Sequence, residues 1–398
     1  MSKNKVKRNS SRRRQAMHRG KETSTKPKKP VTRRKDFSAS GKGKKRKKRR
    51  VHKMKPWQIA LICVGAFIAA LLAFGLMYVY AKWSKIDTKS IKADDIIINE
   101  EVKKNKNVDL GDGYTNVALF GVDSRDGDLG EGNRTDCIIV ASLNNKTKEI
   151  KMVSVYRDTL LDLSEGTYQK CNAAYSYGGP VLAINMLNMN LDLDIQDYVS
   201  VNFLALADVI DMVDGITVKL TDEEVVHMNN YCVETSKVTG KKYKKIEPAV
   251  AGTYKLNGVQ AVSYARIRYT AGGDYKRTER QRLVLKKTAD KLKQQDLATL
   301  NKIIDKVMPE VSTSFTTKEI LSLATGAFDY ELGETTGFPF DLETPEQIPG
   351  YSGSYVIPKG LEENAIKLHQ FLYPNKNYTP TATVTDISNT LNDMTNVY

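Results

Sequence analysis

The sequence has few of the residue types that most often build metal centres and nucleophile–base pairs. Its 398 residues include four histidines, which do not cluster, and four cysteines, of which no pair has the spacing of metal ligands. A zinc site and histidine-based catalysis are therefore not expected. Cys63 lies within a long apolar run, and the other three cysteines cannot all pair. The sequence leaves open whether Cys171 and Cys232 form a disulfide. Cys137 is expected to be an inert buried thiol.

Large apolar and aromatic residues are almost missing from the first 56 residues. This segment has 25 Lys or Arg and only two acidic residues, a net charge of +23, whereas the rest of the chain has a net charge of −7. Such a polar segment cannot bury enough surface to offset its chain entropy, so we predict that it is disordered. Phe37 is its only aromatic residue, which leaves no set of rings for base stacking and argues against specific nucleic-acid binding. We expect this tail to fix the membrane topology and to touch anionic lipid.

Charged residues are also absent from residues 57–81, a run rich in Ala, Leu, Ile and Phe. A helix of this length would extend about 37 Å, which is enough to span a bilayer. Tryptophan and tyrosine flank the run at both ends, as interfacial aromatic residues do. No small-residue cleavage site follows, so we predict a single transmembrane helix and not a cleaved signal peptide. The positive-inside rule then places residues 1–56 in the cytoplasm and everything after Lys82 outside the cell.

The remaining sequence predicts a stalk, one large domain and a short end segment. Residues 82–113 are polar and charged and are expected to form an extracellular stalk. In residues 114–373, short apolar runs alternate with helical patterns, which predicts an α/β domain with a central mixed sheet flanked by helices. Strands are expected at 116–122, 137–143, 150–155, 198–203, 216–220, 336–340 and 354–357. Helices are expected at 180–191, 204–213, from Thr221 onward, and at 278–311, 316–330 and 361–372. Residues 374–398 are rich in Asn and Thr and are expected to be loosely attached.

Charged residues gather where three of the predicted strands begin or end. They are Asp123 and Arg125 after the first strand, Arg134 and Asp136 before the second, and Arg157 and Asp158 after the third. Ligands of α/β sheets tend to bind at the carboxyl ends of the strands. Aspartate supplies the hard oxygen ligands that Mg²⁺ prefers, and arginine offers a planar fork for phosphate. The pattern therefore predicts a divalent cation held together with phosphate oxygens. Solvated surface charge is the competing interpretation, and three such combinations in one domain make it the weaker one.

A fourth charged segment runs from residue 264 to residue 282. It contains Arg266, Arg268, Lys276, Arg277, Arg280, Gln281 and Arg282. Arg277 and Gln281 are four residues apart at the start of a predicted helix, so their side chains face one way and can point at one anion.

Six motifs in this order resemble the LytR–CpsA–Psr family. They are Gly-Val-Asp-Ser-Arg at 121–125, Arg-Thr-Asp at 134–136, Ser-Val-Tyr-Arg-Asp-Thr at 154–159, Lys-Cys-Asn-Ala-Ala-Tyr-Ser-Tyr-Gly-Gly-Pro at 170–180, Leu-Asn-Gly-Val-Gln-Ala-Val-Ser-Tyr-Ala-Arg-Ile-Arg at 256–268 and Gly-Asp-Tyr-Lys-Arg-Thr-Glu-Arg-Gln at 273–281. The resemblance covers about residues 116–291. No single motif is decisive, but the order of all six is specific. A single-pass anchor with a basic tail also fits this family.

The resemblance implies a phosphotransferase on the outer face of a bacterial cell membrane. Such enzymes take a glycopolymer linked through pyrophosphate to a polyprenyl lipid, pass the phosphoglycan to a peptidoglycan hydroxyl, and release polyprenyl phosphate. The residues that the resemblance assigns to Mg²⁺ are Asp123 and Asp136. It assigns the pyrophosphate to Arg134 and Arg157, and the lipid phosphate to Arg266, Arg268, Arg277 and Gln281, with Arg125 as a further substrate contact. Asp136 and Asp158 are two alternative candidates for the group that deprotonates the sugar hydroxyl.

Three questions stay open in the sequence. The family houses the prenyl chain in an apolar tunnel, and the predicted helix at 180–191 is either a wall of it or an ordinary core face. The transferred polymer, whether teichoic acid, capsule or another glycan, is not specified. A regulatory protein of the transcriptional-attenuator type and a non-catalytic module that binds lipid or wall polymer are alternative functions. The predicted topology argues against the first, and the presence of both candidate metal carboxylates argues against the second.

Overall fold

The structure is a computed structural model, and it describes residues 87–89, 91–104, 113–124, 128–164, 166–316, 318–320 and 329–398. These residues all belong to one unit, Val64–Tyr398. The predicted tail at 1–56, the predicted transmembrane helix at 57–81 and the first five residues of the predicted stalk lie outside the described residues. Within the described ranges, none of the helices combines the length and the apolar character needed to cross a bilayer.

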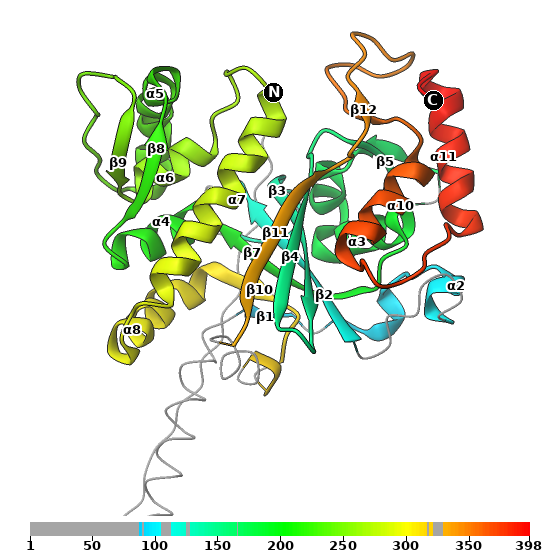
Figure 1. Ribbon diagram of the computed structural model, residues 1–398, viewed down its shortest axis with the longest axis horizontal. Coiled ribbons are helices and arrows are strands. Elements are labelled where there is room, and N and C mark those ends of the chain that lie inside the picture. The colour runs from blue at the N-terminus through cyan, green and yellow to red at the C-terminus, as the bar shows by residue number, and fades with distance from the viewer. Residues whose placement is uncertain are drawn as a thin grey trace, which may run out of the picture. The chain divides into compact units, whose positions relative to one another are not determined.

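A mixed sheet occupies the centre of this unit (Figure 1). Its strands are β1 (Asp87–Thr88), β2 (Tyr114–Val122), β3 (Thr135–Asn144), β4 (Glu149–Val155), β7 (Ile195–Asn202), β10 (Val311–Thr313) and β11 (Glu331–Phe338). They lie in the order β1-β10-β7-β2-β3-β4-β11. β2 is parallel to β7 and β4 is parallel to β11, whereas β3 is antiparallel to both β2 and β4. The carboxyl ends of β2, β4 and β7 therefore share one edge of the sheet with the start of β3.

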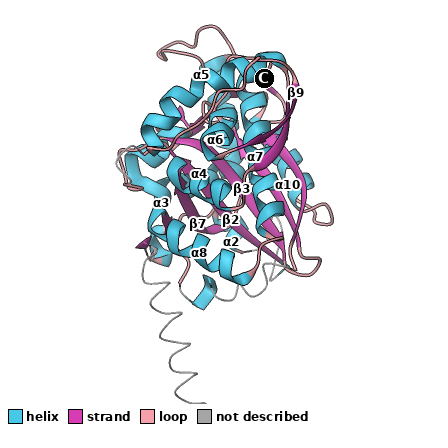
Figure 2. Ribbon diagram, turned by 90° about the vertical axis from the view of Figure 1, so that its left-hand side faces the viewer, coloured by secondary structure: helices cyan, strands magenta, loops and turns pink. Residues whose placement is uncertain are grey.

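Helices cover both faces of the sheet, as the sequence predicts. One face carries α3 (Asn172–Leu191), α10 (Leu361–Leu372) and α11 (Ala382–Thr395), and the other carries α4 (Phe203–Met212), α6 (Gly258–Ala265), α7 (Gly273–Leu292) and α8 (Leu297–Val307). Figure 2 shows α4 and α6 in front of the strands on this second side. Each strand packs against helices on both faces, because successive side chains point to opposite sides of a sheet. Ala118 and Phe120 of β2 enter the core under α3, and Leu119 between them faces α7.

Several smaller elements surround this framework. They are η1 (Ala93–Asp95), α2 (Glu100–Lys103), η3 (Met308–Glu310) and the three pairs of short antiparallel strands β5 (Leu160–Asp162) with β6 (Tyr168–Lys170), β8 (Ile216–Leu220) with β9 (Gly252–Leu256), and β12 (Leu342–Glu343) with β13 (Ile357–Pro358). α5 (Asp222–Thr239) follows β8 and packs on α6. Its start is the predicted cap: the Thr221 hydroxyl accepts from the Glu224 N–H, and the Glu224 carboxylate accepts from the Thr221 N–H.

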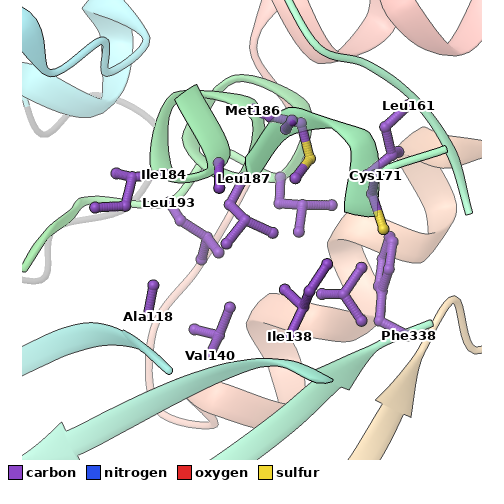
Figure 3. Packing of buried hydrophobic residues seen from close by; sticks show 14 of the residues in the cluster. Ala118, Ile138, Val140, Leu161, Cys171, Ile184, Met186, Leu187, Leu193 and Phe338 are labelled. Carbon is purple, nitrogen blue, oxygen red and sulfur yellow. The ribbon is translucent and has the colours of Figure 1, made fainter. Parts of the chain in front are cut away.

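The second half of α3 is an ordinary core helix and not the wall of a tunnel. Ile184 and Leu187 are fully buried and belong to one cluster with Ala118 and Val140 of the sheet (Figure 3). Burying each such side chain contributes about 1.5–3 kcal/mol. Of the two interpretations that the sequence left open, the core face is the correct one. α3 also includes helical residues from Asn172 onward, but Gly178 and Gly179 have non-helical backbone angles and interrupt it, so the part after this kink begins at Pro180, as predicted.

The end of the chain is more ordered than the sequence suggested. We expected a loose segment after residue 374, but α11 packs against α10 and α3, with Val384 and Leu391 buried. Asp192, which follows α3, holds this segment in place. Its carboxylate accepts hydrogen bonds from the N–H and the hydroxyl of Thr381, both at 2.8 Å, and from the Tyr378 hydroxyl at 2.8 Å. A buried carboxylate satisfied in this way ties the C-terminal helix to the core.

One further expectation needs correction, and one question that the sequence left open is answered. The helix predicted at 278–311 is in fact α7 and α8 with a break between Leu292 and Leu297, followed by η3. Cys171 and Cys232 do not pair, since the three cysteines that the structure describes are free thiols. The Cys171 thiol instead donates to the carbonyl oxygen of Tyr156 at 3.2 Å. Burial raises the pKa of Cys137 to about 12, in agreement with an inert thiol.

His369 makes the stability of this fold sensitive to acid. The side chain is buried, its Nε2 lies 2.9 Å from the carbonyl oxygen of Leu191, and its ring stacks on Tyr378 with centroids 3.6 Å apart. Burial lowers the pKa of His369 from 6.5 to about 4. Between these two values the unfolded chain binds a proton that the folded chain does not bind. The free energy of unfolding should therefore fall by about 3 kcal/mol as the pH drops from 6.5 to 4.

Urea unfolding at pH 7 and at pH 4.5 measures this effect. His369→Phe keeps an aromatic ring against Tyr378 and removes the titrating group, so we expect a smaller loss of stability in acid than in the wild type. The matched control is His227→Gln on α5, which should keep the acid sensitivity. An unchanged pH dependence in His369→Phe would rule out this residue as its source.

Candidate functional site

Asp136 occupies a β-bulge at the edge of the sheet. Gly121 of β2 pairs with Cys137 and the next residue, Val122, pairs with Thr135, so Asp136 has no partner on β2. Bulges of this kind re-aim a side chain and are frequent beside active sites. Gly121 permits the close approach, because a Cβ atom there would lie 2.8 Å from the Cβ of Cys137. The local backbone therefore points the Asp136 carboxylate at the edge where β2 and β4 end.

Three of the predicted residues meet at this bulge. Arg157, two residues beyond β4, forms an ion pair with Asp136 through its NH1 group. Gln281 of α7 donates from Nε2 to the carbonyl oxygen of Asp136 at 3.3 Å. Burial lowers the pKa of Arg157, but Asp136 and Asp158 raise it by more, and the net shift is upward. Arg157 is therefore a permanent cation at this edge.

Asp158 is surrounded by cations. Its Oδ1 lies 3.2 Å from Lys170 Nζ, and its Oδ2 lies 3.3 Å from Arg268 NH2 and 3.6 Å from Arg157 Nε. The side chain is buried, and the backbone is held by Val356, whose N–H donates to the carbonyl oxygen of Asp158 at 3.0 Å. Asp158 thus organises three cations around the end of β4.

Arg277 is the most deeply buried charged side chain of the site, with 1% of its surface exposed. Its NH2 donates to Asp274 Oδ2 at 2.9 Å, and its Nε and NH1 have no hydrogen-bond partner among the described residues. Burial lowers the pKa of Arg277, and Asp274 opposes this shift. A buried donor without a partner costs about 1–3 kcal/mol. An arginine kept in this state is suited to bind an anion that satisfies the open donors.

Arg266, which follows α6, is held in a fixed orientation by its neighbours. Its guanidinium lies 4.9 Å from the ring centre of Phe203 and donates to the Thr235 hydroxyl at 3.1 Å and to Glu234 Oε2 at 3.2 Å. Phe203 is the first residue of α4, directly after β7. Aromatic stacking and two hydrogen bonds fix the plane of the guanidinium, which a phosphate-binding fork requires.

Two apolar cavities extend from these charges along the sheet face that α4, α6 and α7 cover. The first has a volume of about 250 Å³, and its few polar side chains are Asp136, Asn202, Arg266, Arg277 and Gln281. The second has a volume of about 640 Å³ and lies beside the first, since both are lined by Leu119, Val201, Leu206 and Leu285. The predicted tunnel therefore corresponds to cavities on the face opposite to α3. Together they suit a ligand with a long apolar chain and an anionic head.

The remaining predicted residues have different positions. Asp123 follows β2, and its N–H donates to the carbonyl oxygen of Arg134 at 3.0 Å, so both lie beside the bulge. The Arg134 side chain is exposed. Arg125 lies outside the described residues. The described residues contain no group of three or more His, Cys, Asp or Glu side chains that could hold a metal ion. Mg²⁺ bound by Asp123 and Asp136 would need oxygen ligands from a substrate or from water, which is a common arrangement for this ion.

The sequence interpretation missed Lys170 and Asp274. Lys170 ends β6 and lies 4.7 Å from the ring centre of Tyr355, besides its pairing with Asp158. Asp274 is the counterion of Arg277. Both residues lie within the six motifs, and Asp274 precedes Arg277 by three residues on one helix. That spacing predicts a contact, so this pair was recognisable from the sequence.

Apolar cavities that end in arginines and aspartates, within a mixed α/β domain, are the features expected of the class of proteins that bind a lipid with an anionic head group. A model of the LytR_cpsA_psr family matches residues 75–332. The chain belongs to the LytR–CpsA–Psr family, as the six motifs predict.

Curated relatives are similar over most of the chain. The polyisoprenyl-teichoic acid–peptidoglycan teichoic acid transferase TagT of Bacillus subtilis (strain 168) is 28% identical over 305 residues, which are 75% of this chain and 90% of that protein. Biofilm regulatory protein A of Streptococcus mutans is 31% identical over 267 residues, 64% of this chain and 60% of that protein. A solved structure of TagT bound to LI-WTA has the same fold, with a TM-score of 0.52 and 24% identity, and the match covers 69% of this chain and 99% of that one.

Proposed function

We propose that this chain transfers a glycopolymer from a polyprenyl-pyrophosphate lipid to a peptidoglycan hydroxyl and releases polyprenyl phosphate. The observation that carries the proposal is the pair of apolar cavities whose charged end contains Arg277, two of whose donors have no hydrogen-bond partner among the residues that the structure describes. A prenyl chain fits the apolar space, and the pyrophosphate fits the arginines at its end. The names of relatives such as TagT support teichoic acid as the polymer class.

The side chains at the end of the cavities have different roles in phosphoryl transfer. Displacement at phosphorus depends mainly on positioning and on neutralisation of charge. Arg266, Arg277 and Gln281, which line the first cavity, bind the phosphate next to the lipid. Arg268, which the resemblance assigned to that phosphate, pairs with Asp158 beside Arg157, so we assign it together with Arg157 to the phosphate that is transferred. Mg²⁺ held by Asp123 and Asp136 would add positive charge at the pyrophosphate oxygens. Asp136 also orients Arg157 through their ion pair.

The location of the reaction is part of the proposal. The charge asymmetry about residues 57–81 supports a catalytic domain outside the cell, with the basic tail against anionic lipid in the cytoplasm. Protease added to intact protoplasts should digest the domain and spare a tag at the N-terminus. Protection of the domain would contradict the cell-wall assignment and favour the regulatory alternative that the name of the Streptococcus mutans relative suggests.

A cavity-filling substitution tests the lipid assignment. Leu206 of α4 lines both cavities, so Leu206→Trp should fill them and weaken the binding of polyprenyl pyrophosphate at least tenfold. Binding of inorganic pyrophosphate, which needs only the arginines, should change little. An equal loss of affinity for both ligands, with an unchanged melting temperature, would mean that the cavities do not hold the lipid chain.

A further inference from the structure

The proposed transfer defines the side from which the acceptor hydroxyl must approach. In displacement at phosphorus the attacking and leaving oxygens lie roughly in line. The leaving lipid phosphate is proposed to lie at the end of the first cavity, which Asp136 and Arg277 line. Arg157 contacts Asp136 through NH1, and its Nε lies 3.6 Å from Asp158 Oδ2. The other oxygen of Asp158 lies 3.2 Å from Lys170 Nζ. The acceptor is therefore expected on the Lys170 side, away from the cavity.

An ordered group of tyrosine and amide side chains lies on that side. Lys170 Nζ is 4.7 Å from the ring centre of Tyr355. The Tyr355 hydroxyl donates to Gln169 Oε1 at 2.6 Å, and the Lys170 N–H donates to the same oxygen at 3.0 Å. Both bonds use Oε1, so the Nε2 group of Gln169 is a donor without a hydrogen-bond partner among the described residues. Tyr351 packs edge-on against Tyr355, with ring centroids 5.3 Å apart.

Tyr177 is the exposed member of this group, with 61% of its surface open to solvent. It lies in the second turn of α3, which begins two residues after Lys170. Burial raises the pKa of Tyr355, and Tyr351 and Asp158 add to the increase. Tyr177 contributes as well, so it lies within electrostatic reach of Tyr355. The ring of Tyr177 is thus an open aromatic surface beside the charged edge of the sheet.

The segment between β12 and β13, residues 344–356, forms the border of this surface (Figure 1). Its Val356 N–H donates to the carbonyl oxygen of Asp158 at 3.0 Å, which ties the segment to the end of β4. Gly353 is exposed, and a Cβ atom there would lie 3.9 Å from Lys170 Nζ. The segment that carries two of the tyrosines therefore passes directly beside Lys170.

The chemistry of this surface fits a sugar better than a phosphate. A tyrosine presents an apolar ring face and a polar hydroxyl. A sugar ring likewise has an apolar face of C–H groups and a rim of hydroxyls, so it can stack on the ring and bond to an amide. The cation of the group, Lys170, is already paired with Asp158, which makes the surface less suited to the anionic repeats of a donor polymer.

We propose that this surface is the subsite for the acceptor sugar of peptidoglycan, and this inference rests on the proposed function. The ring of Tyr177 stacks on the apolar face of the sugar, and Gln169 Nε2 donates to one of the sugar oxygens. Tyr355 holds the Gln169 amide, and Tyr351 holds Tyr355. A sugar bound in this way presents its hydroxyl to the transferred phosphate from the side opposite to the lipid.

Steady-state kinetics of the whole, detergent-solubilised chain test the subsite. The donor is a polyprenyl-pyrophosphate-linked disaccharide, the acceptor is a soluble peptidoglycan fragment, and Mg²⁺ is present throughout. Tyr177→Ala should raise the KM of the acceptor about 5- to 20-fold, while kcat and the KM of the donor change less than twofold. Tyr177→Phe keeps the ring face and should keep the KM of the wild type. Gln169→Ala should also raise the KM of the acceptor.

Tyr269→Ala is the matched control, because Tyr269 is 74% exposed and lies in the connection between α6 and α7. It should leave both KM values unchanged. An unchanged acceptor KM in Tyr177→Ala would overturn the inference, and so would an increase in Tyr269→Ala alone. An increase only in the KM of the donor would mean that the surface binds the donor glycan, which also contradicts the proposal.

Absence of transfer by the wild type, with lipid binding intact, would instead contradict the proposed function. Direct titration with the peptidoglycan fragment then still tests the subsite. The affinity of Tyr177→Ala should be about 5- to 20-fold lower than that of the wild type, and equal affinities would overturn the inference.

Discussion

Asp136→Ala is expected to lower the rate of glycopolymer transfer about 10²- to 10³-fold while the protein still binds its lipid. The substitution removes the partner of Arg157 and one of the two carboxylates proposed for Mg²⁺. Loss of one preorganised group that stabilises charge in the transition state typically has this size. The lipid is held by residues of α6 and α7 and by the cavities, so its affinity should change less than threefold. Transfer rate and polyprenyl pyrophosphate binding, both measured against Mg²⁺ concentration, separate the two effects.

Asp386→Ala is the matched control for this variant, since Asp386 is an exposed aspartate on α11, far along the chain from the site. It should transfer at the wild-type rate. Asp136→Asn keeps the shape of the side chain and should resemble Asp136→Ala, because the charge is what matters for Arg157 and for the metal. A rate near that of the wild type in Asp136→Ala would remove the metal assignment and the role of the bulge.

Arg277→Ala should produce the largest loss of lipid affinity of any single substitution in the site. Each charge-assisted hydrogen bond contributes about 1.5–3 kcal/mol, which corresponds to a 10- to 150-fold change in Kd. Arg277 has two open donors in a nearly solvent-free position, so the upper part of this range is expected. Arg277→Lys keeps the positive charge beside Asp274 but loses the planar fork, and its affinity should lie between those of the wild type and the alanine variant. Titration with polyprenyl pyrophosphate measures the Kd of the wild type and of the two Arg277 variants.

Lys276→Ala provides the comparison within the same helix. Lys276 is exposed and pairs with Glu279, so its removal should change affinity by less than a factor of two. Removal of Arg277 also leaves Asp274 without its partner, which lowers stability, and melting curves must therefore accompany the titration. Wild-type affinity in both Arg277 variants would mean that the open donors do not face the lipid phosphate.

The middle of the sheet was predictable because its strands are short apolar runs bounded by turn residues, whereas β1 and β10 were not predicted and β7 and β11 begin three and five residues before the predicted strands. β2, β3 and β4 begin and end within two residues of the predicted bounds, and α10 has the predicted bounds. The capping box at Thr221 was also predictable, since it depends on two residues three positions apart. Local spacing thus carries most of the information about where these elements lie.

Strand direction and the bulge at Asp136 were not predictable from local spacing. The sequence placed the charges of residues 123 and 157–158 at carboxyl ends, but only the antiparallel course of β3 brings Asp136 to the same edge. The extra residue in β3 depends on the contact between Gly121 and Cys137, two residues on different strands. The side of the sheet that holds the cavities depends in the same way on which helices pack there. These features depend on contacts between segments that are distant in the sequence, and the periodicity of apolar residues contains no information about such contacts.

The C-terminal helix was missed for a different reason. Val384, Ile387 and Leu391 have helical spacing, but the surrounding Asn and Thr residues obscured it. The helix is stabilised mainly by its contacts with α10 and by the bonds from Thr381 and Tyr378 to Asp192. Most helical stability in proteins comes from tertiary packing of this kind and not from propensity.

The most direct test of this account is the transfer reaction itself. The purified chain is incubated with a polyprenyl-pyrophosphate-linked glycan and peptidoglycan, with and without Mg²⁺, and with Asp136→Ala in parallel. We expect Mg²⁺-dependent formation of a phosphodiester-linked glycan on peptidoglycan, with one polyprenyl phosphate released per glycan transferred and with little product from Asp136→Ala. Tight lipid binding without any release of polyprenyl phosphate would contradict it, and would identify the protein as a binding module and not a transferase.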